Sequence, residues 1–257
     1  MGQPTYYSDF RLGSKKLSDF GGIIYNAGEN VINLLPNMTH ITESMNSIDG
    51  EIYYGAKYEP RTIEVPCYFE GDVDLDELKS WLCSKEEQDF NYIGDDKKIS
   101  VVYASQLDMS AYYNNPFQGT MTITFIAYNP FWKPINDDLF SLFFINSDTS
   151  IFLTGGGNVK NKPLIEVRPK YNNQAKVRLK FGDYIIVLQN LVKPIFIDCE
   201  NEEVYEMQAD TRVTAMNKFY TTDFYDFPYL EPNKQTEIKL LEGAVDRVLV
   251  TRNARWI

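Results

Sequence analysis

The chain has 257 residues, of which 44% are hydrophobic and 14% aromatic, so it has enough apolar surface for a folded core. Its 25 Lys and Arg residues against 36 Asp and Glu residues leave a net charge of −11, which excludes a typical nucleic-acid-binding protein. The one histidine, His40, excludes metal sites built on two histidines and is the sole candidate base for a Ser-His-Asp triad. Cys67, Cys83 and Cys199 match no metal-ligand or disulfide spacing, which favours a reducing compartment.

The first residues lack a basic segment followed by an apolar run, so we expect no signal peptide. The most apolar stretch, residues 139–145, is far shorter than the roughly 18 residues that indicate a membrane span. We therefore expect a soluble protein that is made in the cytoplasm and has no membrane partner.

The sequence predicts a single helix, over residues 74–84. Apolar side chains recur there at helical spacing, at Leu75, Leu78, Trp81 and Leu82. Asp72 or Asp74 can cap its N-terminus. Because the helix has one apolar face, we expect it to pack on a sheet.

Most of the remaining chain alternates between apolar and polar residues with a period of two, which is typical of β-strands. The predicted strands are 62–65, 100–103, 120–125, 176–181, 184–188, 195–197, 237–241 and 247–251. Turn signals containing glycine separate them, among them Asp49-Gly50 and Gly182-Asp183. The fold class is therefore mainly β.

The chain is expected to form two modules. Residues 1–135 form an α+β module of antiparallel strands with the one helix, and residues 158–257 form an antiparallel β-sandwich of the galectin-like or jelly-roll type. Residues 136–157 are interpreted as a linker that ends in a flexible triple glycine. Whether the last strand stays in the second module or returns to the first is left open. The first module carries 10 basic and 19 acidic residues, a net charge of −9.

Three aspartates, Asp72, Asp74 and Asp76, are spaced like the start of a calcium-binding loop. The loop also needs Gly at its sixth position and Glu at its twelfth, where this chain has Glu77 and Cys83. Helix capping explains the aspartates better, so no metal is expected. The triple glycine is followed by no Lys-Ser or Lys-Thr pair and opens no helix, so it is not a phosphate-binding loop.

Adjacent acidic residues occur at Glu86-Glu87, Asp95-Asp96, Asp137-Asp138 and Glu202-Glu203. A glycosidase needs two carboxyl groups that face each other across a cleft, whereas neighbours on a strand point to opposite faces. We therefore interpret these pairs as solvated surface and expect no catalytic residues and no cofactor. His40 lies in a polar stretch and is interpreted as a surface or interface residue.

The segment from Phe219 to Tyr229 is unusually aromatic. Aromatic faces can stack on sugar rings, so a saccharide or subunit contact is conceivable through Phe219, Tyr220, Phe224, Tyr225 and Tyr229. The alternative is that these rings pack inside the sandwich or at a subunit contact, where Tyr and Phe are enriched. The second interpretation is favoured because a loop interrupted by proline buries some of its rings.

Several motifs in order resemble one known family. They are Arg61 to Gly71, the capped helix, the strand 119–127 followed by Asn129-Pro130-Phe131-Trp132, Gly157 to Asn161, Pro163 to Val167, Asp226 to Leu230 and Arg255 to Ile257. Together they make the chain similar to the distal tail proteins of long-tailed, non-contractile bacteriophages. The turn Glu231 to Lys234 lacks a glycine that many members of that family have.

The resemblance implies a structural protein of the virion with no enzymatic activity. Its first module would form a ring, usually of six copies, around the DNA channel at the end of the tail tube. Its partners would be further copies of itself, the tail tube protein, a tail-associated tip or hub protein, and receptor-binding or baseplate proteins. No specific nucleic-acid binding is implied. The alternative is a saccharide-binding module that recognises the host surface through residues 219–229.

Overall fold

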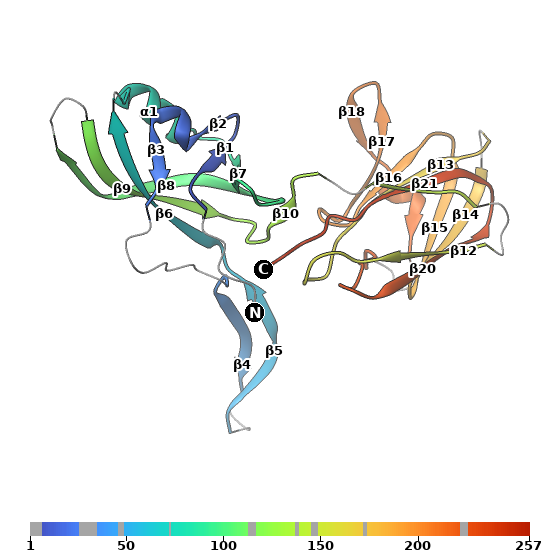
Figure 1. Ribbon diagram of the computed structural model, residues 1–257. Coiled ribbons are helices and arrows are strands. Elements are labelled where there is room, and N and C mark those ends of the chain that lie inside the picture. The colour runs from blue at the N-terminus through green and yellow to red at the C-terminus, as the bar shows by residue number, and fades with distance from the viewer. Residues whose placement is uncertain are drawn as a thin grey trace. The chain divides into compact units, whose positions relative to one another are not determined.

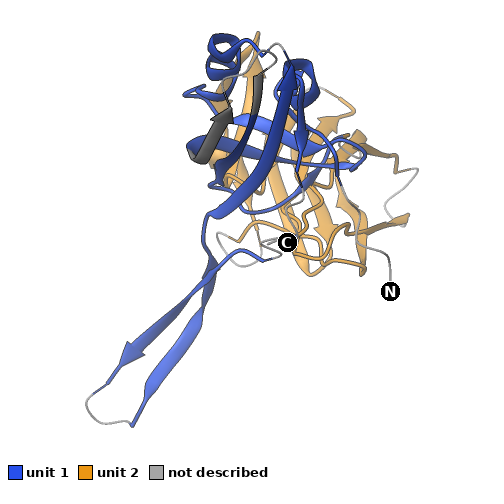
Figure 2. Ribbon diagram, turned by 60° about the vertical axis from the view of Figure 1, so that its left-hand side comes forward, with its two compact units in different colours: residues 1–135, 257 blue, residues 136–256 orange. Residues whose placement is uncertain are grey.

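The computed structural model describes residues 7–25, 35–45, 49–71, 73–112, 117–136, 139–144, 149–171, 174–221 and 226–257. The chain divides into two compact units, Met1–Ile135 with Ile257, and Asn136–Trp256, which Figure 2 distinguishes by colour. We describe each unit by itself. Among the described residues, no helix has the length and apolar character needed to span a lipid bilayer.

Unit 1 is built on one antiparallel sheet. Its strands are β1 (Phe10–Leu12), β2 (Lys15–Lys16), β3 (Gly22–Ile24), β6 (Arg61–Gly71), β7 (Gln88–Tyr92), β8 (Lys97–Tyr112), β9 (Phe117–Ala127) and β10 (Lys133–Pro134). The strand order is β2-β1-β7-β8-β9-β6-β3, and β10 pairs with β8 (Figure 1). A short 3-10 helix, η1 (Leu17–Phe20), precedes β3.

Strand β6 shows why one face of this sheet is buried. Alternate residues from Ile63 to Phe69 are buried, which places their side chains on one side of the strand. The full length of β6 pairs with β9, whose residues Ile123 and Phe125 are also fully buried. The apolar period of two seen in the sequence therefore forms the core of unit 1.

The helix α1 (Leu75–Leu82) packs on this core. Leu78, Trp81 and Leu82 are buried, and the Asp74 carboxylate caps the helix by accepting hydrogen bonds from the backbone of Asp76 and Glu77, both at 3.0 Å. The cap satisfies two N–H groups that have no partner inside the helix. The expected cluster of three aspartates is thus a helix start, with Asp72 outside the described residues.

Strands β4 (Met38–Ser44) and β5 (Glu51–Tyr58) form a separate two-stranded hairpin, which extends away from the sheet of unit 1 (Figure 1). They pair from Met38 with Tyr58 to Ser44 with Glu51, with a register shift between Ile41 and Thr42. The Asp49-Gly50 turn signal lies between the two strands, with Gly50 in the left-handed region at φ 100°.

Unit 2 consists of two antiparallel sheets. The first has the order β11 (Leu139–Leu142), β21 (Val245–Thr251), β13 (Leu164–Pro169), β16 (Ile195–Asp198), β17 (Glu203–Gln208) and β18 (Thr211–Thr214). The second has the order β12 (Ser150–Thr154), β20 (Gln235–Glu242), β14 (Gln174–Phe181), β15 (Tyr184–Leu191) and β19 (Phe219–Tyr220). A 3-10 helix, η2 (Met216–Lys218), leads into β19.

The core of unit 2 draws buried residues from strands of both sheets, including Ile165, Ile197 and Val250 from the first and Leu179 and Ile186 from the second. This is the organisation of a β-sandwich. The mainly β fold with one α-helix, which the sequence predicted, is confirmed for the part of the chain that the structure describes.

The expected linker is corrected by the structure. Residues 136–157 belong to unit 2 and contain β11 and β12, which pair with β21 and β20 respectively. These strands are four and five residues long, too short to give a clear alternation in the sequence. Strand β21, which the sequence left unassigned to a module, lies between β11 and β13 inside unit 2.

The triple glycine is packed against backbone and is no flexible joint. Gly155 bridges Pro232 and Gly157 bridges Arg255. A Cβ atom on Gly155 would lie 2.1 Å from the carbonyl oxygen of Glu231, and one on Gly157 would lie 1.9 Å from that of Arg255. Glycine is needed here because two other chain segments come this close.

Candidate functional site

The predicted aromatic residues of 219–229 do not come together as one exposed surface in the described part of the segment. Phe219 lies in the core of unit 2 and stacks on Phe227, with ring centroids 5.1 Å apart. The prediction that Phe219 can make a surface contact is therefore wrong. Tyr220 is 47% exposed. Phe224 and Tyr225 lie outside the described residues.

Tyr229 is half-buried and lies in a local cluster of its own. Its ring contacts Tyr184 edge-on at 5.8 Å, and the Lys160 ammonium lies 4.0 Å from the ring centroid. The same ammonium pairs with Glu231 at 3.3 Å. These contacts hold the loop before β20 in place, and the Lys160 ammonium covers one face of the ring.

The acidic pair Asp95-Asp96 is held by a neighbouring cation and a hydroxyl donor. Asp95 accepts a hydrogen bond from the Tyr7 hydroxyl at 2.9 Å, and Lys97 lies 3.6 Å from Asp95 and 3.4 Å from Asp96. Asp137-Asp138 lies outside the described residues. Within the described ranges, no group of three His, Cys, Asp or Glu side chains is placed to hold a metal ion.

His40 is exposed on β4, and its ring lies 5.9 Å from that of Tyr53. A small pocket in unit 1 lies beside α1 and is lined mainly by apolar side chains of Leu75, Leu78, Leu82, Tyr103 and Met121. Neither place brings together a nucleophile, a base and an orienting group, which nucleophilic catalysis requires.

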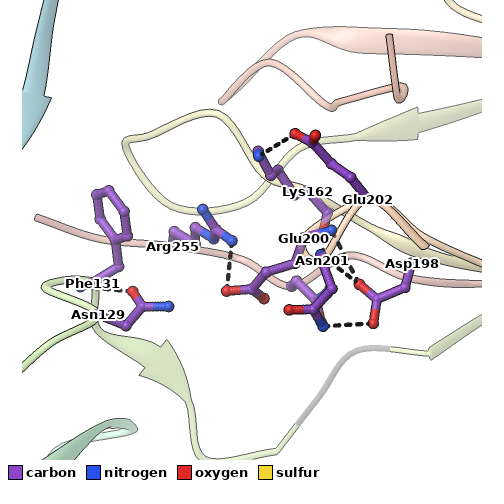
Figure 3. Close-up of polar contacts among 9 residues, drawn as sticks. Asn129, Phe131, Lys162, Asp198, Glu200, Asn201, Glu202 and Arg255 are labelled. Atoms are coloured by element: carbon purple, nitrogen blue, oxygen red, sulfur yellow. Dashed lines mark hydrogen bonds and ion pairs between the residues drawn. The ribbon is translucent and has the colours of Figure 1, made fainter. Parts of the chain in front are cut away.

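The most buried ion pair of the described residues lies in unit 2 and is shown in Figure 3. The Arg255 guanidinium contacts the Glu200 carboxylate at 2.8 Å, and the two side chains are 8% and 20% exposed. Beside it, Asp198 accepts hydrogen bonds from the backbone of Glu200 and Asn201 and from the Asn201 amide. Each charge has a partner, so the cluster fastens the segment after β21 to the β16–β17 turn.

The β4–β5 hairpin of unit 1 carries several exposed aromatic and aliphatic side chains. Tyr53 is 61% and Tyr54 59% exposed, and Met38 and Ile41 are half exposed. The sequence reasoning recognised the turn but missed this surface, although Tyr53, Tyr54 and Tyr58 stand close together in the sequence. Exposed apolar groups gathered on one element are typical of a contact with another molecule.

Comparisons with known proteins relate the chain to phage tail proteins. Residues 18–127 match the model of the family described as phage tail protein RIFT-related domain. This match covers most of unit 1 and less than half of the chain. No curated protein matches the chain in sequence.

The fold of the whole chain is similar to that of solved phage proteins. It matches the crystal structure of SPP1 Dit (gp 19.1), described as a paradigm of the hub adsorption apparatus in phages that infect Gram-positive bacteria, with a TM-score of 0.69 and 10% identity. That match covers 98% of this chain and 100% of the other. A chain of the phage P2 baseplate, in its activated conformation with calcium, matches with a TM-score of 0.50 and 13% identity over 98% of this chain and 100% of that one.

The resemblance to distal tail proteins that the sequence predicted is therefore confirmed, by the match of residues 18–127 to the RIFT-related family model and by the similarity in fold to SPP1 Dit.

Proposed function

We propose that the chain is a structural hub protein of a phage tail tip, which forms a ring between the tail tube and the tip or baseplate and surrounds the DNA channel. The observation that carries the proposal is the RIFT-related domain of phage tail proteins at residues 18–127. The likeness to the SPP1 Dit hub, over nearly all of both chains, supports it.

The finer parts of the proposal are the copy number and the partners. Six copies of the chain form the ring, and the tail tube protein and a tip or hub protein bind its two sides. The β4–β5 hairpin is the natural contact between copies, because an isolated two-stranded hairpin is marginally stable in water and this one exposes Tyr53 and Tyr54. Apolar burial against a second copy would stabilise it.

The acidity of unit 1 fits a passage for DNA. Its net charge of −9 repels phosphates, so DNA would move through the ring without being held, whereas Lys and Arg would release counterions and bind it. The proposal includes no catalytic step, no cofactor and no specific nucleic-acid binding. The saccharide-binding alternative gains no support from the burial of Phe219.

Labelling of virions tests the location. Antibodies raised against the purified chain should bind at the tail tip under the electron microscope, and binding along the tube, on the capsid or nowhere on the particle would contradict the proposal.

Native mass spectrometry of the purified chain tests the ring. A double substitution, Tyr53→Ser with Tyr54→Ser, should weaken the assembly, while Tyr171→Ser, an equally exposed tyrosine of unit 2, should leave it unchanged.

A further inference from the structure

The β4–β5 hairpin is connected to the sheet of unit 1 through a joint at Glu59 and Pro60. Before the joint, β5 pairs with β4 up to Tyr58, and after it β6 pairs with β9 from Arg61 onward. The chain therefore changes its partner strand within two residues. The direction in which the hairpin extends from the sheet depends on what holds this joint (Figure 1).

Backbone and side-chain contacts restrict the joint. The Glu59 N–H donates a hydrogen bond to the Asn37 carbonyl oxygen at 2.8 Å, so the pairing of the hairpin continues beyond Met38 and Tyr58. The Thr39 hydroxyl donates a hydrogen bond to the Glu59 carboxylate. The ring of Pro60 fixes its own φ and disfavours the helical region for the residue before it, which keeps the joint extended. The exit from β5 is thus short, hydrogen-bonded and stiff.

The ring of Phe131 contacts the hairpin at this joint. It meets the ring of Tyr58 edge-on, with centroids 5.3 Å apart and planes at 82°, which is a preferred geometry of aromatic pairs. Tyr58 is the last residue of β5 and is 36% exposed, so the contact lies at the surface where the hairpin begins. In the described ranges, no other aromatic pair joins the hairpin to the rest of unit 1.

Phe131 belongs to a segment that is itself fixed to unit 1. Its N–H donates a hydrogen bond to the side-chain oxygen of Asn129 at 3.4 Å, as Figure 3 shows. The residue before it, Pro130, is buried, and the residue after it, Trp132, packs against the core of unit 1. A side chain between two fixed neighbours gives the hairpin a firm support.

We propose that Phe131 is a positioning residue, which holds the β4–β5 hairpin in one orientation before the hairpin meets its partner. The inference rests on the proposed function, in which the hairpin is the contact between copies, and adds how that contact is prepared. A hairpin that is already held loses less conformational freedom on binding, so the association is tighter. The exposed rings of Tyr53 and Tyr54 are then presented at a fixed place.

The orientation is measured in the full chain at a concentration where it is monomeric. One spin label is attached to the native Cys83, which is exposed at the end of α1, and the other to the cysteine introduced by Ser44→Cys at the far end of β4. Cys67 and Cys199 are buried and stay unlabelled. Pulsed electron paramagnetic resonance gives the distribution of distances between the labels, and we expect a single narrow distribution.

Phe131→Ala should broaden this distribution, because the hairpin loses its support. It should also weaken self-association in analytical ultracentrifugation about five- to tenfold, because the freed hairpin must then be ordered on binding. Phe131→Tyr restores a ring at this place and should restore both readouts. Tyr128→Ala is the matched control: it removes an exposed ring of the same segment that pairs with no ring of the hairpin in the described structure, and it should change neither readout.

A broad distribution in the labelled parent chain, or one that Phe131→Ala leaves unchanged, would overturn the inference. A lower thermal midpoint of unit 1 without any broadening would also overturn it, since that is the result of a purely structural role. If Phe131→Ala does not fold, Tyr58→Ala decides, because it removes the other ring of the pair from the surface: a broader distribution supports the inference and an unchanged one rejects it.

The two readouts separate this inference from the proposed function. The distance distribution needs no assembly, so a chain that stays monomeric at every concentration contradicts the contact between copies, while the labels still decide the orientation. A broader distribution in Phe131→Ala with an unchanged association constant would overturn the positioning role, because orientation would then have no effect on assembly.

Discussion

The indole nitrogen of Trp81 donates a hydrogen bond to the carbonyl oxygen of Leu12 at 3.0 Å. This bond joins α1 to β1, and the indole ring also stacks on Phe20 at 4.7 Å and on Phe10 at 5.7 Å. Trp81 is therefore the residue through which the helix is fixed to the core of unit 1, by one directional bond and by apolar contact.

Replacement of Trp81 separates these two contributions. Trp81→Ala should lower the free energy of unfolding of unit 1 by about 3–5 kcal/mol, because it leaves a large cavity. Trp81→Phe keeps a ring but leaves the Leu12 carbonyl without its donor, and should cost about 1–3 kcal/mol. Urea denaturation of the two variants checks both values, and an unchanged midpoint for Trp81→Ala would show that the helix does not depend on this contact.

The cap of α1 gives a smaller and more local effect. Asp74→Ala removes the acceptor for two backbone N–H groups and should destabilise unit 1 by about 1 kcal/mol. Asp76→Ala is the control, since Asp76 makes only an exposed pair with Lys79 and should change stability by less than about 0.5 kcal/mol. Equal losses in the two variants would contradict a specific cap.

The close approach at Gly157 should make this position intolerant of any side chain. Gly157→Ala places a Cβ against the Arg255 carbonyl and should lower the stability of unit 2 severely, or prevent its folding. Gly94→Ala is the matched control, because Gly94 also has a positive φ but has open space around it. The control should show only the cost of backbone strain, about 1 kcal/mol. Thermal unfolding of both variants measures the difference.

Two tyrosines predict a loss of stability at high pH. Burial, with the hydrogen bond to Asp95, raises the pKa of Tyr7 from 10.0 to about 12, and burial raises the pKa of Tyr92 to about 12 as well. The folded state therefore keeps these protons after the unfolded chain has lost them, so stability is full below pH 10 and falls between pH 10 and about 12.

The double variant Tyr7→Phe, Tyr92→Phe should show a flatter decline of stability over this range. Urea denaturation at pH 9, 10 and 11 checks the slope, and Tyr128→Phe, which removes an exposed hydroxyl of the same unit, is the control. A slope equal to that of wild type would show that other groups cause the decline.

The sequence predicts the parts of this fold that follow from local patterns. Strand β6 and the helix are examples. The spacing of two between Ile63 and Val65 predicts the buried face of the strand, and the spacing of three between Leu78 and Trp81 predicts the buried face of the helix. The interpretation of the triple glycine as a flexible joint is wrong. Glycine is required there because the backbone of Arg255, far away in the sequence, packs against Gly157. No local pattern carries a contact of that kind.

The candidate surfaces also include features that local sequence patterns predict and features that they do not. The Asp49-Gly50 turn was visible in the sequence, but nothing local indicated that β4 and β5 stay apart from the sheet. Phe219 is buried because β19 pairs it with Leu188 in the middle of β15, and β19 has only two residues, too few to show an alternation in the sequence.

The place of β21 has a consequence for synthesis on the ribosome. Unit 1 has all of its sheet strands within residues 10–134, so its sheet can close while the rest of the chain is still being made. The first sheet of unit 2 needs β21 between β11 and β13, so β11 waits without its partner until residues 245–251 have emerged. During that interval β11 and β12 lack the strands they pair with, so we expect this half of the chain to be the more prone to aggregate while it is being made.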